Sequence, residues 1–231
     1  MTELFAQLQR RDRSGADCVA DNGICPDWIA DNFDRYVPPF WQHVYLTLIS
    51  VAIGFAIAFG LALLAHRRRW LVGPITQATG ILYTLPSVAV FFLLLPITGR
   101  GNTTAIIALV SYTLLILFRN VIAGLENVPA ETRDAGRGMG LTPRQLLWRV
   151  EMPLALPEIM AGLRIAATTT VGLASLAFLA GAGGLGEALF DDINFRSNVL
   201  VAGGLAILIA VALDLLILAL QKALTPWTRA T

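Results

Sequence analysis

Five long stretches of this chain carry almost no charged side chains. They cover residues 43–65, 75–97, 102–124, 165–182 and 199–221. Only the third and the fifth contain a charge, Arg119 and Asp214 respectively. About 20 helical residues cross the roughly 30 Å hydrocarbon core of a membrane. A transmembrane strand would instead need about 10 residues with strict alternation of apolar and polar side chains, and these stretches do not alternate.

The sequence therefore predicts an all-α integral membrane protein with five transmembrane helices, because a helix satisfies its own backbone hydrogen bonds in lipid. Composition agrees: 56% of residues are hydrophobic and 14% are charged, against about 25% charged residues in an average soluble domain. The net charge of +1 gives no reason to expect a nucleic-acid partner. Residues 1–37 lack the apolar core of a cleavable signal peptide.

The positions of Lys and Arg predict the orientation. With the N-terminus outside, the cytoplasmic segments hold 11 of these residues and the outer segments hold 6, four of them in the N-terminal tail. The positive-inside rule favours this arrangement. We therefore expect an extracytoplasmic tail over residues 1–40, a transmembrane domain over 41–225 and a cytoplasmic tail over 226–231.

The only two cysteines, Cys18 and Cys25, lie in the predicted outer tail. An oxidising compartment would permit a disulfide that closes a small loop. The alternative is two free thiols. A metal site is not expected, because no histidine or further cysteine lies nearby.

Most of the cytoplasmic polar sequence lies in one loop, residues 126–164, which is too long for a simple helical hairpin. Pro129 suits the first turn of a helix over residues 130–139, and Gly140 can end that helix. Thr142, Pro143 and Gln145 then indicate a second helix start, with Thr as N-cap and Gln three residues later. Two short helices around a glycine hinge are predicted.

Pro153 and Pro157 are expected to break the chain before the fourth span. Gly136 and Gly138 each weaken the first short helix by roughly 1 kcal/mol relative to Ala, so this helix needs packing to persist. Small residues let another backbone approach closely. The loop either lies on the membrane surface or docks a cytoplasmic partner.

The spacing within this loop resembles the EAA motif of ABC-importer permeases, which reads Glu-Ala-Ala, three residues, Gly, nine residues, Ile, one residue, Leu-Pro. The matching positions here are Asp134, Ala135, Gly136, Gly140, Val150, Met152 and Pro153. Four of them differ from the motif, and each difference keeps charge sign, size or apolarity. The spacing is kept throughout.

In that family the loop forms a coupling helix that sits in a groove of a separate ATPase. The resemblance implies a type I ABC importer permease (MetI-like) core in a prokaryotic plasma membrane. The expected partners are a cytoplasmic ATPase dimer that binds ATP and Mg²⁺, a second permease copy or paralogue, and an extracytoplasmic solute-binding protein. The coupling residues would be Asp134, Ala135, Gly136, Arg137, Met139, Gly140, Leu141, Thr142 and Pro153.

Three further segments resemble permeases for the quaternary-ammonium osmoprotectants glycine betaine, carnitine and choline. They read LYTLPS at 82–87, GNTTAI at 101–106 and GAGGLG at 181–186, and the resemblance covers about residues 40–225. It implies import of such solutes. Import of another small solute, such as an amino acid, is the alternative.

Polar groups in the predicted spans mark a candidate substrate pathway, because a cationic ligand can bind aromatic faces. The candidates are Tyr83, Thr84, Ser87, Tyr112, Thr169 and Ser175. The alternative, which we favour, is that the hydroxyls bond carbonyls of their own helices and the tyrosines lie near the membrane interfaces. A candidate outer gate follows the fourth span and contains Gly183, Gly184 and Gly186; the alternative is a flexible turn.

The isolated charge Asp214 is costly inside a membrane and such charges are often functional. We expect it to pair with Arg119 or Arg164 rather than to transfer protons. His43 and His66 stand alone at the predicted membrane edges and are expected to be interfacial. The small residues of the fourth span predict close packing against its counterpart in a second permease.

The sequence shows no Walker A pattern and no catalytic set, so we do not expect an enzyme, and we expect no cofactor on this chain. The main rival is an ion-coupled secondary transporter. Such a carrier usually has more spans, internal repeats and several buried charges.

Overall fold

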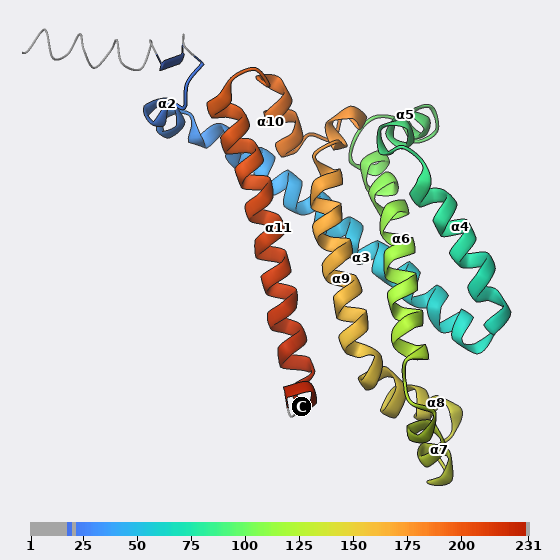
Figure 1. Cartoon of the computed structure of the whole chain (residues 1–231). Coiled ribbons are helices and arrows are strands. Elements are labelled where there is room, and N and C mark those ends of the chain that lie inside the picture. Colours follow the sequence, from blue (N-terminus) through green and yellow to red (C-terminus); the bar gives the residue numbers. More distant parts are fainter. Residues whose placement is uncertain (1–17, 20–21, 230–231) are drawn as a thin grey trace, which may run out of the picture.

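The computed structural model describes residues 18–19 and 22–229, and these residues form helices joined by turns (Figure 1). Residues 1–17 and 20–21 of the predicted outer tail lie outside the described part, as do residues 230–231. Four helices are long and apolar enough to cross a membrane: α3 (Val37–Arg67), α6 (Asn102–Glu126), α9 (Met152–Ala174) and α11 (Arg196–Leu224). The shorter α-helices are α2 (Pro26–Asp31), α4 (Val72–Thr84), α5 (Ser87–Thr98), α7 (Ala130–Gly138), α8 (Pro143–Leu146) and α10 (Leu185–Asp191).

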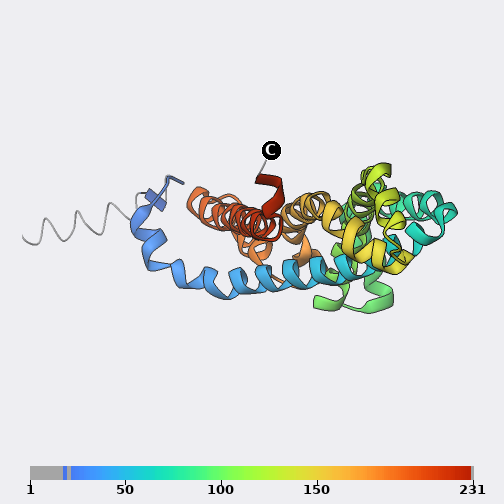
Figure 2. The same cartoon turned by 90° about the horizontal axis from the view of Figure 1, so that it is seen from below.

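The helices form a row with one helix laid across it. Figure 2 shows α11, α9, α6 and α4 in sequence, with α3 along one side of the row. Alanines at four-residue spacing on α3, Ala58 and Ala62, are fully buried in a cluster with Phe118 and Val121 of α6 and Ile159 of α9. Small side chains at this spacing line one face of a helix. They let α3 lie close to its two neighbours.

The second predicted span, residues 75–97, is not one straight helix. It is α4 followed by α5, with an angle of 97° between them. Leu85 between them is extended, with φ −64° and ψ 137°. Pro86 explains the break, because proline disfavours the helical conformation of the preceding residue and lacks the N–H that would continue the ladder. The span predicted as one helix is therefore a bent pair of helices, and with this pair counted as one span the described residues hold five.

The fourth predicted span begins earlier and ends earlier than expected. Helix α9 runs from Met152 to Ala174, in line with the helical turns that begin at Pro143, whereas the hydropathy pattern predicted residues 165–182. Pro153 lies in the first turn of α9, where proline is tolerated, and Pro157 lies inside the helix. The prediction that these two prolines break the chain is wrong.

Asp214 on α11 pairs with Arg164 on α9, as predicted. The guanidinium donates from Nε and Nη2 to the two carboxylate oxygens, each at 2.8 Å. This fork geometry matches a carboxylate with two parallel hydrogen bonds. Arg119, the other partner considered, is exposed on α6.

A disulfide joins Cys18 and Cys25, which is one of the two alternatives that the sequence left open. Within the closed loop, the Asn22 side chain donates to the carbonyl of Asn194 at 2.6 Å and accepts from the N–H of Arg196 at 2.9 Å. The segment before α3 is thus held against the start of α11.

The small residues of α9 pack mainly within this chain. Ala166, Ala167 and Ala174 are buried. A Cβ added at Gly162 would lie 2.3 Å from Cβ of Asn120 on α6, whereas a Cβ added at Gly172 would meet open space among the described residues. The two glycines of one helix therefore differ: Gly162 permits the α6–α9 contact and Gly172 does not take part in it.

We predict that Gly162→Ala lowers the stability of the permease by about 2 kcal/mol, because overpacking a close contact forces the backbones apart. The matched control Gly172→Ala should leave stability unchanged or raise it, since Ala is the better helix former by about 1 kcal/mol. Thermal unfolding of the purified protein in detergent measures both. Equal melting temperatures for the two variants would contradict the role given to Gly162.

Candidate functional site

The turn after α7 explains why a glycine stands at position 140. Gly140 has φ +79°, a left-handed conformation that costs other residues roughly 1–2 kcal/mol. Its N–H donates to the carbonyl of Arg137 at 2.9 Å, and the N–H of Leu141 donates to the carbonyl of Gly136 at 3.2 Å. These two bonds form a Schellman motif, which satisfies the last carbonyls of a helix. The predicted end of the helix at Gly140 is confirmed.

The next helical run begins at once. The Thr142 hydroxyl accepts from the N–H of Gln145 at 3.3 Å, and the Gln145 side chain accepts from the N–H of Thr142 at 2.9 Å. Pro143 occupies the first helical position. The predicted capping box is confirmed. Only Met139 to Thr142 separate the two helices, so caps on both sides fix the direction of this turn.

Close packing holds α7 against α8. Gly136 is buried, and a Cβ there would lie 2.6 Å from Leu146 Cδ1, so the second Ala of the motif is replaced by the only smaller residue. Leu146 and Leu147 are buried beneath it. The tip of the turn is exposed in contrast: Met139 keeps 75% of its surface.

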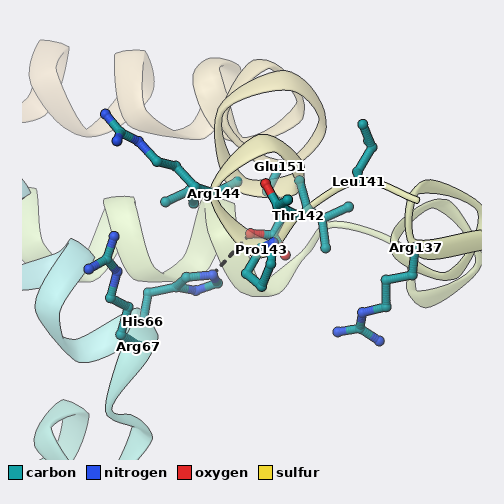
Figure 3. A pocket seen from close by; sticks show the side chains of 10 residues that line it. His66, Arg67, Arg137, Leu141, Thr142, Pro143, Arg144 and Glu151 are labelled. Atoms are coloured by element: carbon teal, nitrogen blue, oxygen red, sulfur yellow. Dashed lines mark hydrogen bonds and ion pairs between the residues drawn. The ribbon is translucent and has the colours of Figure 1, made fainter. Parts of the chain in front are cut away.

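A buried carboxylate joins this loop to the transmembrane helices. Glu151 is 5% exposed and accepts from His66 Nε2 of α3 at 3.0 Å and from Arg133 Nε of α7 at 2.9 Å. Arg133 also donates from Nη2 to the carbonyl of Leu125 in α6. Figure 3 shows His66 reaching Glu151 beneath the coupling turn. His66 therefore does not stand alone, as the sequence suggested, because it pairs with Glu151.

Sequence reasoning missed Glu151 and Arg133. Glu151 occupies the single unspecified position of the motif, between Val150 and Met152. One signal was available, because a lone carboxylate between apolar residues must find a partner if it is buried. The partner on α3 is 85 residues away in sequence, so no local pattern reveals it.

A cavity of about 620 Å³ lies between the end of α3 and the loop. Its lining includes Arg67, Arg137 and Arg144 around an apolar floor of Leu146 and Leu147. In Figure 3, Arg67 and Arg144 lie on one side of Pro143 and Arg137 on the other. The cavity therefore presents positive charge beside the exposed tip.

Four of the six candidate pathway residues gather at the α4–α5 break. The rings of Tyr83 and Tyr112 lie with centroids 6.1 Å apart, and the Tyr112 hydroxyl donates to the carbonyl of Leu85 at 2.6 Å. The break after α4 takes this carbonyl out of the helical hydrogen-bond pattern. Thr84 bonds the carbonyl of Ile81 in its own helix, as the simpler alternative expected, and Ser87 begins α5. The other two candidates, Thr169 and Ser175, are on α9 and just after it.

The candidate outer gate is a tightly held loop. Gly183 and Gly184 have φ +74° and +92°, and a Cβ at Gly186 would lie 1.8 Å from the carbonyl oxygen of Ser175. The side chain of Gln42 on α3 donates to the carbonyl of Ala182 at 2.9 Å. These contacts tie the loop to α3 and to the end of α9.

Known proteins resemble this chain in sequence and in fold. Residues 50–230 match the family described as "Binding-protein-dependent transport system inner membrane component". The chain belongs to this family of ABC-importer permeases. It is thus the membrane component of an importer and not its ATPase subunit, and it lies in the inner membrane. Its family works with an ATPase and a binding protein.

Relatives with assigned substrates extend this comparison. The osmoprotectant import permease OsmW of Salmonella typhimurium is 37% identical over 206 residues, 86% of this chain and 96% of that one. The choline permease OpuBB of Bacillus subtilis is 33% identical, over 80% of this chain and 87% of its own length. In fold, the chain matches the MetNI methionine transporter in inward-facing form with a TM-score of 0.69 and 24% identity, covering 80% of this chain and 95% of that one.

We predict that Glu151→Gln destabilises the permease by about 3 kcal/mol, because removing one partner leaves buried cationic donors without a counter-charge. The control is Glu126→Gln, which breaks the exposed Arg69–Glu126 pair at the same end of the molecule and should cost less than about 1 kcal/mol. Unfolding in detergent and co-purification of the ATPase measure the difference. Equal behaviour of the two variants would refute the bridging role of Glu151.

Proposed function

We propose that this chain is the permease of an importer for quaternary-ammonium osmoprotectants, such as glycine betaine, choline and carnitine, and that the 126–164 loop couples the ATPase to alternating access. The relatives that suggest the substrate are permeases whose names specify these solutes at 32–37% identity. The doubly capped turn at Gly140, joined to three transmembrane helices through Glu151, carries the proposal for coupling.

In this proposal the ATPase dimer, which binds ATP and Mg²⁺, receives the coupling tip in a groove. Met139 supplies the apolar contact, while Arg137 and Thr142 are exposed beside it. Gly140 and Leu141 set the turn. Asp134 pairs with Arg137 at 3.0 Å on the outer face of α7. The remaining positions of the motif are Ala135, Gly136 and Pro153. Closure of the ATPase dimer would move this rigid unit and rotate the helices attached to it.

The orientation proposed has the N-terminus outside and the C-terminus in the cytoplasm. Three arginines, Arg67 to Arg69, end α3 beside the coupling loop, in agreement with the positive-inside rule. The Cys18–Cys25 disulfide precedes the opposite end of α3, and disulfides persist in oxidising compartments. Both observations support an orientation with the 126–164 loop inside and residues 181–186, the glycine loop, outside.

The substrate pathway is proposed to pass the paired rings of Tyr83 and Tyr112, because aromatic faces attract quaternary ammonium groups. A second copy or a paralogue of the permease would complete the pathway. The exposed stretch of α9 that includes Ile165 and Gly172 is the proposed contact, with Thr169 and Ser175 beside it. Gly183, Gly184 and Gly186 would form the outer gate that the binding protein meets.

The test is ATP-dependent uptake of labelled betaine, choline and carnitine by the reconstituted complex with its binding protein. We expect at least one of the three to accumulate. Uptake of an amino acid with none of the three would refute the substrate, and uptake driven by an ion gradient without the ATPase would refute the transport class.

For coupling, Gly140→Ala forces a non-glycine residue into a left-handed turn and should lower uptake and ATPase association about fivefold, the equivalent of about 1 kcal/mol. The matched control is Gly138→Ala, two residues away in the helix and also facing open space, which should keep wild-type uptake. Identical uptake by both variants would contradict coupling through this turn.

A further inference from the structure

The two histidines of the chain lie near opposite ends of α3. His43 Nε2 lies 3.0 Å from the carbonyl oxygen of Val171, and His66 Nε2 lies 3.0 Å from the Glu151 carboxylate. His66 follows His43 by 23 positions, which span about 34 Å of helix, and Val171 follows Glu151 by 20 positions, which span about 30 Å. Both distances match the thickness of the hydrocarbon core. Helix α3 is thus tied to the α9 run at both membrane faces.

The bond from His43 satisfies the carbonyl of Val171, which has no partner within α9. Val171 is among the last four residues of α9, whose carbonyls lack a partner in the next turn; the N–H of Ser175 bonds Gly172 instead, at 3.3 Å. A carbonyl only accepts, so His43 carries its hydrogen on Nε2. The ring is fully buried and its Nδ1 has no hydrogen-bond partner among the described residues. His43 therefore does not stand alone, as the sequence suggested, but is buried in a contact between α3 and α9.

The glycine loop rests directly on this joint. A Cβ added at Gly184 would lie 3.5 Å from His43 Nδ1, so the backbone of the loop passes close to the ring. Gly186 packs on the carbonyl of Ser175, the residue after α9. The loop therefore contacts both members of the α3–α9 pair at their outer end.

Between the two ties, apolar side chains of α3 and α9 pack against each other. Val51 of α3 is buried with Met160 and Ala167 of α9, and Ala58 of α3 is buried with Ile159. Close-packed interiors transmit displacement because they are nearly incompressible. Movement at one end of the pair must therefore appear at the other.

We propose that the two histidines make α3 and α9 one strut that carries movement of the coupling loop to the outer glycine loop, with His43 as the positioning residue at the outer end. This inference rests on the proposed coupling role of the 126–164 loop. At the inner end, Arg133 of α7 and His66 of α3 share Glu151, so the loop pushes on both helices. At the outer end, His43 keeps the pair together beneath Gly184.

The test compares His43→Gln, His43→Asn and His43→Leu in the complete reconstituted complex. The glutamine amide nitrogen can reach the position of Nε2 and donate to Val171, whereas the shorter asparagine and the apolar leucine cannot. We expect Asn and Leu to lower solute imported per ATP hydrolysed about tenfold, the effect of leaving a buried carbonyl unpaired, with ATPase activity and assembly retained. Gln should restore most of the ratio.

A parallel fall of uptake and ATPase activity in all three variants would show a merely structural role and overturn the proposal, as would wild-type ratios in Asn and Leu.

A second readout needs no substrate. Glu187→Cys, exposed at the start of α10, is labelled from outside with a membrane-impermeant thiol reagent, with and without ATP.

If α3 and α9 move as one strut, ATP should change the labelling rate of the thiol introduced by Glu187→Cys several-fold when position 43 is His or Gln. With Asn at position 43, ATP should not change this rate. An ATP response equal in all three would overturn the strut. Failure of the wild type to import any osmoprotectant, with the labelling pattern intact, would refute only the proposed substrate.

Discussion

The carboxylate of Glu151 is the contact on which the cytoplasmic half of the molecule depends. A charge removed from water at the edge of a membrane must be paired, and here the pairing draws in His66 from α3 and Arg133 from α7, which also holds the end of α6. Because three helix ends meet at one buried group, the turn at Gly140 is tied to the spans. A loop that looks peripheral in sequence is mechanically part of the bundle.

The same rule, that backbone and charged groups need partners away from water, accounts for the irregular places in the spans. The break at Pro86 frees the carbonyl of Leu85, and the Tyr112 hydroxyl bonds it. The end of α9 frees the carbonyl of Val171, and His43 bonds it. Arg164 and Asp214 satisfy each other between α9 and α11. These polar side chains thus lie where helices stop or charges meet.

Much of this could be predicted from the sequence because it depends on local chemistry. The long uncharged runs located α3, α6 and α11, and the caps at Gly140 and Thr142 are set by neighbours within five residues. The break at Pro86 and the early start of α9 were missed because hydropathy measures how apolar a stretch is, not where its helix axis turns. His43 and Glu151 were missed because their partners come from distant segments. The roles of the coupling and pathway residues stay predictions.

We propose that movement generated by a cytosolic ATPase enters this protein at the turn around Gly140. The most direct measurement is the accessibility of that turn. Both natural cysteines are joined in a disulfide, so Met139→Cys adds one free thiol at the tip. We expect an impermeant maleimide to label this thiol in inside-out vesicles and to leave it unlabelled in right-side-out vesicles. The bound ATPase should protect the thiol from labelling. Labelling from the outer face would contradict entry of movement at this turn.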